Sequence, residues 1–198
     1  LAGGSKQPLK VELAVRESVP ILGLFEREIP APEGSPPIKV KTYSLDELLA
    51  TKIRALYDRK KGRDVFDLGC ALQLELNRTA LRKMVYYYFY RSGKIFTWNV
   101  FKANLEGKAK DKRFGAEIKP FLRPDADFDA VDAMRRFIAG LDFLSQADER
   151  DAGFLAWAKG RLGRTTSAKK LAKTSHVVHP IKTLMGPITS TAEADALT

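Results

Sequence analysis

The chain has 198 residues, 44% of them hydrophobic, which is enough to bury the core of one sizeable domain or two small ones and excludes disorder over most of its length. Its formal net charge of +10 disfavours an enzyme of small neutral metabolites and favours a polyanionic partner, although a basic protein without such a partner is the plain alternative. A single cysteine, Cys70 in the apolar run GCALQL, excludes an internal disulfide and a Cys-rich zinc site and fits a buried thiol in a reducing cytoplasm.

The first part of the chain is expected to form strands. Residues 9–17 (LKVELAVRE) alternate apolar and charged side chains, and this period of two indicates a strand with one buried face. Residues 18–37 are rich in proline and glycine and are expected to be mostly loop. Residues 38–43 (IKVKTY) alternate again, which predicts a second short strand.

Helices are expected from residue 44 onward. Ser44 is followed three residues later by Glu47, a spacing typical of a capping box, so a helix is predicted from 45 to about 60. Gly62 interrupts it, and a second helix is predicted from residue 63 or 64 to about 76.

Three further helices are predicted, and in the last of them the apolar residues recur at helical spacing. The first covers 79–92 with Thr79 as its cap, although its run YYYFY also fits a strand. The others cover 98–108 and 128–144, the latter capped by aspartates in 125–129, whereas 114–122 stays unassigned.

These elements predict an α+β fold in three parts. Residues 1–43 would contribute strands of a small mixed sheet, and residues 44–158 would form a mainly helical region. From residue 159 onward basic residues dominate and few large apolar residues occur, so 159–198 is expected to be a flexible basic tail.

The first predicted helix places a lysine among apolar residues. At 100° per residue, Leu48, Lys52 and Leu56 lie within about 80° of arc, so Lys52 is expected in the apolar stripe and not on the wet face. A buried ammonium needs an anion or a lowered pKa. The structural alternatives are that Lys52 extends its ammonium to solvent or pairs with Asp64 or Asp67.

The second predicted helix opens with two acids three residues apart. Asp64 and Asp67 share a face and are expected to point toward the interior or a cleft. The helix dipole favours an acid in the first turn, which accounts for Asp64 better than for Asp67. Cations and carboxylates mixed at a helix junction are typical of a phosphate-handling site, because lysine and arginine hold phosphate oxygens while acids hold a metal or orient the cations.

The run SLDELLATKIRALYDRKKGRDVFDL at 44–68, preceded by KVELAVRE at 10–17, resembles the nucleotidyltransferase toxins of the AbiEii/AbiGii type. The matching pattern consists of Lys10-Val11-Glu12 on a strand, Ala50-Thr51-Lys52 on a helix, and R-x-K-x-R-D-x-x-D from Arg59 to Asp67. The resemblance extends from about residue 9 to 75. It implies the DNA-polymerase-β-like nucleotidyltransferase fold, with residues 1–43 as the C-terminal strands of its core.

The resemblance also implies roles for individual residues. Lys52 would contact the triphosphate of an incoming NTP, and Asp64 would be the acid of the later motif. Glu12 would be a third carboxylate, unless it is an exposed strand glutamate. The supporting charge network would consist of Arg59, Lys61, Arg63 and Asp67. Mg²⁺ is the cofactor implied for such an enzyme.

The resemblance implies a toxin of a bacterial toxin–antitoxin or phage-defence system, held in check by a cognate antitoxin. RNA, with tRNA as one form, is the acceptor that the basic charge favours. No run of about 18 apolar residues exists, so no membrane contact is expected, and the cytoplasm is the expected location.

One departure from the family pattern concerns the front of the enzyme. The Gly-Ser turn and the Asp-x-Asp strand whose carboxylates bind metal in this fold are not found, so the chain is expected to be the C-terminal portion of such an enzyme, and the activity of this portion alone is left open. The alternative function is a non-catalytic basic module that binds nucleic acid or a partner protein.

Overall fold

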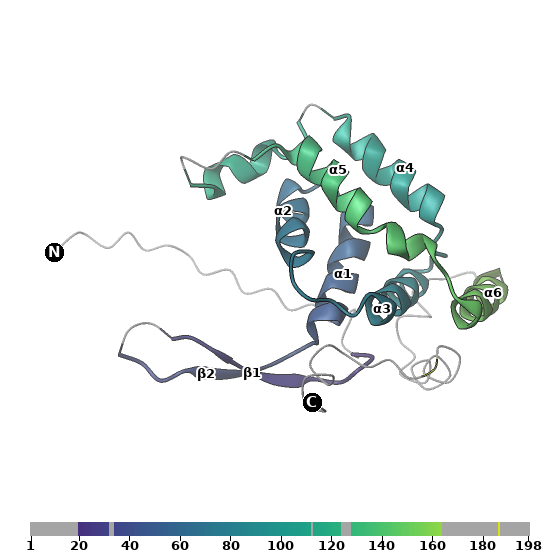
Figure 1. Cartoon of the computed structure of the whole chain (residues 1–198), viewed down its shortest axis with the longest axis horizontal. Coiled ribbons are helices and arrows are strands. Elements are labelled where there is room, and N and C mark those ends of the chain that lie inside the picture. The colour runs from purple at the N-terminus through teal and green to yellow at the C-terminus, as the bar shows by residue number, and fades with distance from the viewer. Residues whose placement is uncertain (1–19, 32–33, 112, 124–127, 164–185, 187–198) are drawn as a thin grey trace.

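The computed structural model describes residues 20–31, 34–111, 113–123, 128–163 and 186. Within this part of the chain a two-stranded sheet precedes a helical body (Figure 1), which confirms the predicted α+β class. The elements are β1 Phe25–Ile29, β2 Ile38–Thr42, α1 Leu45–Asp58, α2 Gly62–Ala71, α3 Arg78–Arg91, α4 Trp98–Ala109, the 3₁₀ helix η1 Ala116–Phe121, α5 Ala130–Gly140, the 3₁₀ helix η2 Asp142–Ser145, and α6 Glu149–Gly163.

Strands β1 and β2 form an antiparallel hairpin that lies below the helices in Figure 1. Its register places Glu26 opposite Lys41 and Glu28 opposite Lys39, so opposite charges face each other across the strands and favour this pairing. The strand at 38–42 confirms the prediction for that segment. The expectation of a loop is wrong for β1. The prolines and glycines around β1 predict turns, and the charged residues of β1 find their oppositely charged partners on β2, further along the chain. The strand expected at 9–17 lies outside the described residues.

Helix α3 supplies the centre of the core. Every residue from Ala80 to Arg91 is buried, because α1 packs on one side of α3 while α6 and η2 pack on others. The ring of Phe89 lies 5.1 Å from that of Tyr57 in α1 and 6.0 Å from that of Phe101 in α4. The run YYYFY is therefore helical and serves packing, and the strand alternative is wrong.

The start of α1 confirms half of the predicted capping box. The Glu47 N–H donates to Ser44 Oγ at 3.2 Å. The Glu47 carboxylate does not reach back to the cap. It is fully buried and accepts hydrogen bonds from the Ile21 N–H at 2.6 Å, the Leu22 N–H at 3.3 Å and the Tyr88 hydroxyl at 2.6 Å. Glu47 thus ties the segment before the hairpin to α1 and α3.

A buried ion-pair network fixes α6 against α3. Arg82 Nε donates to the Asp151 carboxylate at 2.6 Å, and Arg82 Nη2 donates to Asp148 at 2.9 Å. Asp148 caps α6 by accepting the Asp151 N–H at 2.8 Å, and this bond is the main cause of the lowered pKa of Asp148. The helix continues to Gly163, beyond the expected start of the tail at 159; residues 164–185 and 187–198 lie outside the described part.

Several helix ends differ from the predicted ones. Asn77, and not Thr79, caps α3, because its side-chain oxygen accepts the Ala80 N–H at 3.0 Å. Asp129 caps α5 as predicted, but α5 ends at Gly140 and not at residue 144. Leu72 at the end of α2 packs against Gly140, where a Cβ would lie 2.9 Å from Leu72 Cδ1.

Two further observations concern the cysteine and the search for membrane-spanning helices. Cys70 is exposed, so the expectation of a buried thiol is wrong; on α2 it lies outside the buried stripe that Val65 and Leu68 occupy. In the described part of the chain, no helix combines the length and the apolar character needed to cross a membrane.

Candidate functional site

The predicted site residues gather at the junction between α1 and α2. Helix α1 ends just before Arg59, whose N–H donates to the Ala55 carbonyl at 3.0 Å. Helix α2 begins at Gly62, and the Asp64 N–H donates to the Lys61 carbonyl at 3.1 Å. The chain therefore reverses within a few residues and brings the charged side chains of both helices together.

Position 62 is buried in this reversal, and steric contact leaves room only for glycine. A Cβ at position 62 would collide with the backbone of Gly115, which has a φ of +83°. An ion pair between Lys60 Nζ and the Asp111 carboxylate, 3.4 Å apart, lies at the same contact. Asp111 and Gly115 are therefore neighbours of the α1–α2 turn, although they are about fifty residues away from it in the sequence.

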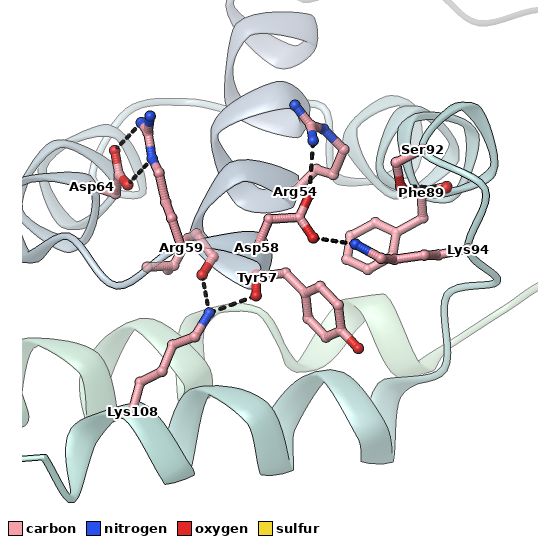
Figure 2. Close-up of polar contacts among 10 residues, drawn as sticks. Arg54, Tyr57, Asp58, Arg59, Asp64, Phe89, Ser92, Lys94 and Lys108 are labelled. Atoms are coloured by element: carbon pink, nitrogen blue, oxygen red, sulfur yellow. Dashed lines mark hydrogen bonds and ion pairs between the residues drawn. The ribbon is translucent and has the colours of Figure 1, made fainter. Parts of the chain in front are cut away.

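Arg59 and Asp64 form the first ion pair of the site. Both nitrogens Nε and Nη2 of Arg59 donate to the Asp64 carboxylate at 2.8 Å (Figure 2). The Asp64 side chain is 2% exposed, whereas that of Arg59 is 48% exposed. The hydrogen bond to Asp64 raises the pKa of Arg59, and the two-point contact fixes the plane of the guanidinium.

Lys52 and Asp67 form the second ion pair, with Lys52 Nζ 2.7 Å from the Asp67 carboxylate. Their side chains are 41% and 46% exposed, so the expectation that Lys52 lies in the apolar stripe is wrong. The buried stripe of α1 follows Leu49, Ile53 and Leu56, and Lys52 lies at its margin. The alternative of an ion pair with Asp67 is the observed one. Asp64 points inward as expected, and Asp67 does not.

The two ion pairs both link the region of α1 to α2. Lys52 is a residue of α1, whereas Arg59 follows the last residue of this helix in an extended conformation. Their partners Asp67 and Asp64 are three residues apart on α2, and of these Asp64 is buried while Asp67 is exposed. The pairs leave one half-exposed ammonium and one half-exposed guanidinium at the α1–α2 junction.

The other predicted residues divide into two groups. Lys61 and Arg63 are exposed at the turn and form no ion pair with any residue in the described ranges. Glu12 lies outside the described residues, so its position stays a prediction. The structure thus brings together Lys52, Arg59, Lys61, Arg63, Asp64 and Asp67.

The carboxylates at this junction do not fit a magnesium site by themselves. Both oxygens of Asp64 accept hydrogen bonds from Arg59, and Asp67 is paired with Lys52. Across the residues that the structure describes, no group of three or more His, Cys, Asp or Glu side chains could hold a metal ion. At this junction, each of the two carboxylates forms an ion pair with a cation.

Lys108 on α4 is a residue of this region that the sequence analysis did not single out. It is 6% exposed, and its ammonium donates to the carbonyl oxygens of Leu56 and Tyr57 at the end of α1 (Figure 2). Burial lowers its pKa to about 8. A signal existed, because Phe101, Leu105 and Lys108 are spaced as one buried face of α4.

A second set of charges lies beside Lys108. Asp58 accepts a hydrogen bond from Arg54 Nη1 at 2.9 Å and pairs with Lys94 (Figure 2). The ammonium of Lys94 also lies 5.4 Å from the centre of the Tyr57 ring. The last turn of α1 is therefore surrounded by cations from its own helix, from the α3–α4 loop and from α4.

The model of one protein family matches residues 1–135. The family is described as "Nucleotidyl transferase AbiEii toxin, Type IV TA system". The matched region includes both strands, helices α1 to α4 and all of the predicted site residues. No curated protein and no solved structure matches the chain.

Proposed function

Because the chain belongs to the AbiEii family of nucleotidyl transferase toxins from toxin–antitoxin systems, we propose that it handles the triphosphate of an NTP whose nucleotide is transferred to an RNA acceptor. The observation that carries the proposal is the pair of half-exposed cations, Lys52 and Arg59, that carboxylates hold at the α1–α2 junction.

Lys52 and Arg59 suit a triphosphate for electrostatic reasons. Lysine supplies a compact charge to phosphate oxygens, and arginine supplies a planar fork of donors. In the proposed reaction a hydroxyl of the acceptor attacks the α-phosphorus, the bond from that phosphorus to the bridging oxygen of the β-phosphate breaks, and pyrophosphate leaves. The hydroxyl proton passes to solvent. The two cations would neutralise the charge that develops on the pyrophosphate.

Asp64 and Asp67 would act as positioning residues in this scheme. Asp64 fixes the guanidinium plane of Arg59, and Asp67 holds the more flexible Lys52 until a phosphate oxygen replaces it. Mg²⁺ supplies charge neutralisation in this class of reaction, and carboxylates other than these two would hold it. Glu12 is one such carboxylate in the proposal.

The acceptor is proposed to be RNA, with tRNA as one form. Support comes from exposed cations on both sides of the contact between Gly62 and Gly115. Lys61 and Arg63 lie on one side, and Lys110 and Arg113 lie on the other. A negatively charged phosphodiester backbone fits such a surface. We further propose that the toxin acts in the bacterial cytoplasm during phage defence and that a cognate antitoxin counteracts it.

The test is a transfer assay. The protein is incubated with tRNA, Mg²⁺ and each of the four α-³²P-labelled NTPs in turn, and the RNA is separated on a denaturing gel. The proposal expects label on RNA with at least one NTP, lost on adding EDTA and in the Lys52→Ala variant. Absence of label with all four NTPs, on tRNA and on total bacterial RNA, contradicts transfer by this chain.

A second candidate function is a basic module that binds nucleic acid without catalysis. It is favoured by the engagement of both carboxylates in ion pairs. Fluorescence anisotropy with labelled tRNA at several salt concentrations, run beside the transfer assay on the same variants, separates the two. The binding module predicts a steep salt dependence and a weaker affinity in a Lys61→Ala/Arg63→Ala double variant, with no response to Lys52→Ala. The enzyme predicts that Lys52→Ala abolishes transfer while RNA affinity is retained.

A further inference from the structure

The last turn of α1 ends in carbonyl groups that the helix cannot satisfy. The final carbonyls of any α-helix lack an N–H one turn further on, and they carry the negative end of the helix dipole. In α1 the Arg59 N–H still bonds to Ala55, but the chain then turns away. The carbonyls of Leu56 and Tyr57 receive the Lys108 ammonium instead, with Tyr57 O at 2.6 Å.

Lys108 reaches these carbonyls from a helix that is distant in the sequence. It projects from the last turn of α4, and its ammonium lies between the end of α1 and the face of the Tyr57 ring, 5.8 Å from the ring centre. Two of its three hydrogens are used by the carbonyls, and the side chain is 6% exposed. The ammonium is therefore not available to a phosphate in solution, which distinguishes Lys108 from Lys52.

The position of Lys108 ties it to the site. The residues immediately after its two carbonyls are Asp58 and Arg59, and Arg59 holds Asp64. The charged groups that face Lys108 are Asp58, Lys60 and Asp64 from α1, the turn and α2, and Lys94 from the α3–α4 loop.

We propose that Lys108 is a positioning residue of the α1–α2 junction: by holding the terminal carbonyls of α1, its ammonium sets the place of Arg59 and of the turn that leads to Asp64. The consequence for nucleotide binding rests on the proposed function, whereas the consequence for the order of the turn does not. Without the ammonium, two inward-facing carbonyls would lose their donor, and the turn would open more often.

The first experiment compares Lys108→Met with Lys102→Met. Both substitutions remove a lysine from α4, but the Lys102 side chain is 48% exposed and pairs with Glu106 on the same helix. Hydrogen exchange is followed at the amides of Arg59 and Asp64, with amides of α3 as the reference. We expect exchange at Arg59 and Asp64 to be at least about tenfold faster in Lys108→Met, with α3 amides unchanged and with no effect of Lys102→Met.

Equal exchange at the junction in wild type and Lys108→Met would overturn the proposal. So would an acceleration of the same size in α3, because that would indicate general destabilisation and not a local positioning role. If Lys108→Met fails to fold, Lys108→Gln, which keeps one amide donor for the carbonyls, replaces it, with Lys102→Gln as its control. Equal exchange at the junction in wild type and Lys108→Gln would then overturn the inference.

Inorganic tripolyphosphate serves as the probe for the site itself, because it carries no base and no sugar. Isothermal titration should show weaker binding to Lys108→Met than to wild type and unchanged binding to Lys102→Met. Equal binding to all three proteins would overturn the link between Lys108 and the site. If wild type does not bind tripolyphosphate at all, the proposed function fails, and the exchange data still decide the role of Lys108.

Discussion

Arg59 and Asp64 are joined by two hydrogen bonds of 2.8 Å, one from each of two guanidinium nitrogens. One partner is buried and the other is half exposed, so the pair anchors a solvent-facing cation to the protein interior. Asp64 therefore acts on the candidate site by fixing the position of the Arg59 guanidinium.

The first prediction concerns that anchor. Asp64→Asn keeps the shape of the side chain but places an amide N–H₂ against a guanidinium donor. We expect the free energy of unfolding to fall by about 1–3 kcal/mol, less than for a fully buried pair because Arg59 can turn to water. Urea denaturation measures the change. Asp67→Asn is the matched control and should cost less than about 1 kcal/mol, because its ion pair is exposed. Equal losses in the two variants would contradict the anchoring role.

The second prediction separates function from stability at Lys52. Lys52→Ala removes an exposed ion pair, so unfolding should change by less than about 1 kcal/mol. Nucleotide transfer should fall by about 10²-fold or more, because a charge that faces the triphosphate is lost. Lys102→Ala is the control, since it also removes a half-exposed lysine with an acidic neighbour. Full transfer activity in Lys52→Ala would rule out the assigned role.

The third prediction concerns Glu47. Glu47→Gln replaces one acceptor oxygen with a donor inside a fully buried cluster of three donors. We expect a loss of about 2–3 kcal/mol in the free energy of unfolding. Tyr88→Phe removes only one of the three donors and should cost less. Thermal unfolding of both variants ranks the effects, and a larger loss in Tyr88→Phe would show that the backbone contacts to Ile21 and Leu22 contribute little.

The fourth prediction is a pH dependence that Lys108 confers. Its pKa is about 8 in the folded protein and 10.5 ordinarily. Below pH 8 both states hold the proton; between pH 8 and 10.5 the unfolded chain holds more protons than the folded one, so stability rises with pH. The unfolding free energy of wild type minus that of Lys108→Met should therefore increase by about 1 kcal/mol from pH 8 to pH 9. A constant difference in urea denaturation over this range would show that Lys108 is not desolvated.

Much of the local structure followed from the sequence. The capping spacing of Ser44 and Glu47 located the start of α1, and Gly62 located the turn before α2. Asp129 located the start of α5. These signals act over three or four residues, so they are present in the sequence itself. The charged spacing from Arg59 to Asp67 likewise identified the family, and it predicted that these side chains lie near one another.

The partners of these residues were decided by the tertiary structure. The helical angle of Lys52 predicted a position inside an apolar stripe, but whether such a position is buried depends on which helices pack over it, and the Lys52 side chain is 41% exposed. Glu47 carries a capping signal, yet its carboxylate serves Ile21, Leu22 and Tyr88 because the chain before the hairpin passes over it.

The sequence by itself therefore determined the class of fold, the order of the helices and the charged motif, since each depends on neighbours in the chain. Only the tertiary structure decided that Asp64 is buried under Arg59 and that Lys108 holds the end of α1. The physical reason is that burial and hydrogen bonding between distant segments depend on packing, and Lys108 is about fifty residues from the carbonyls that it contacts.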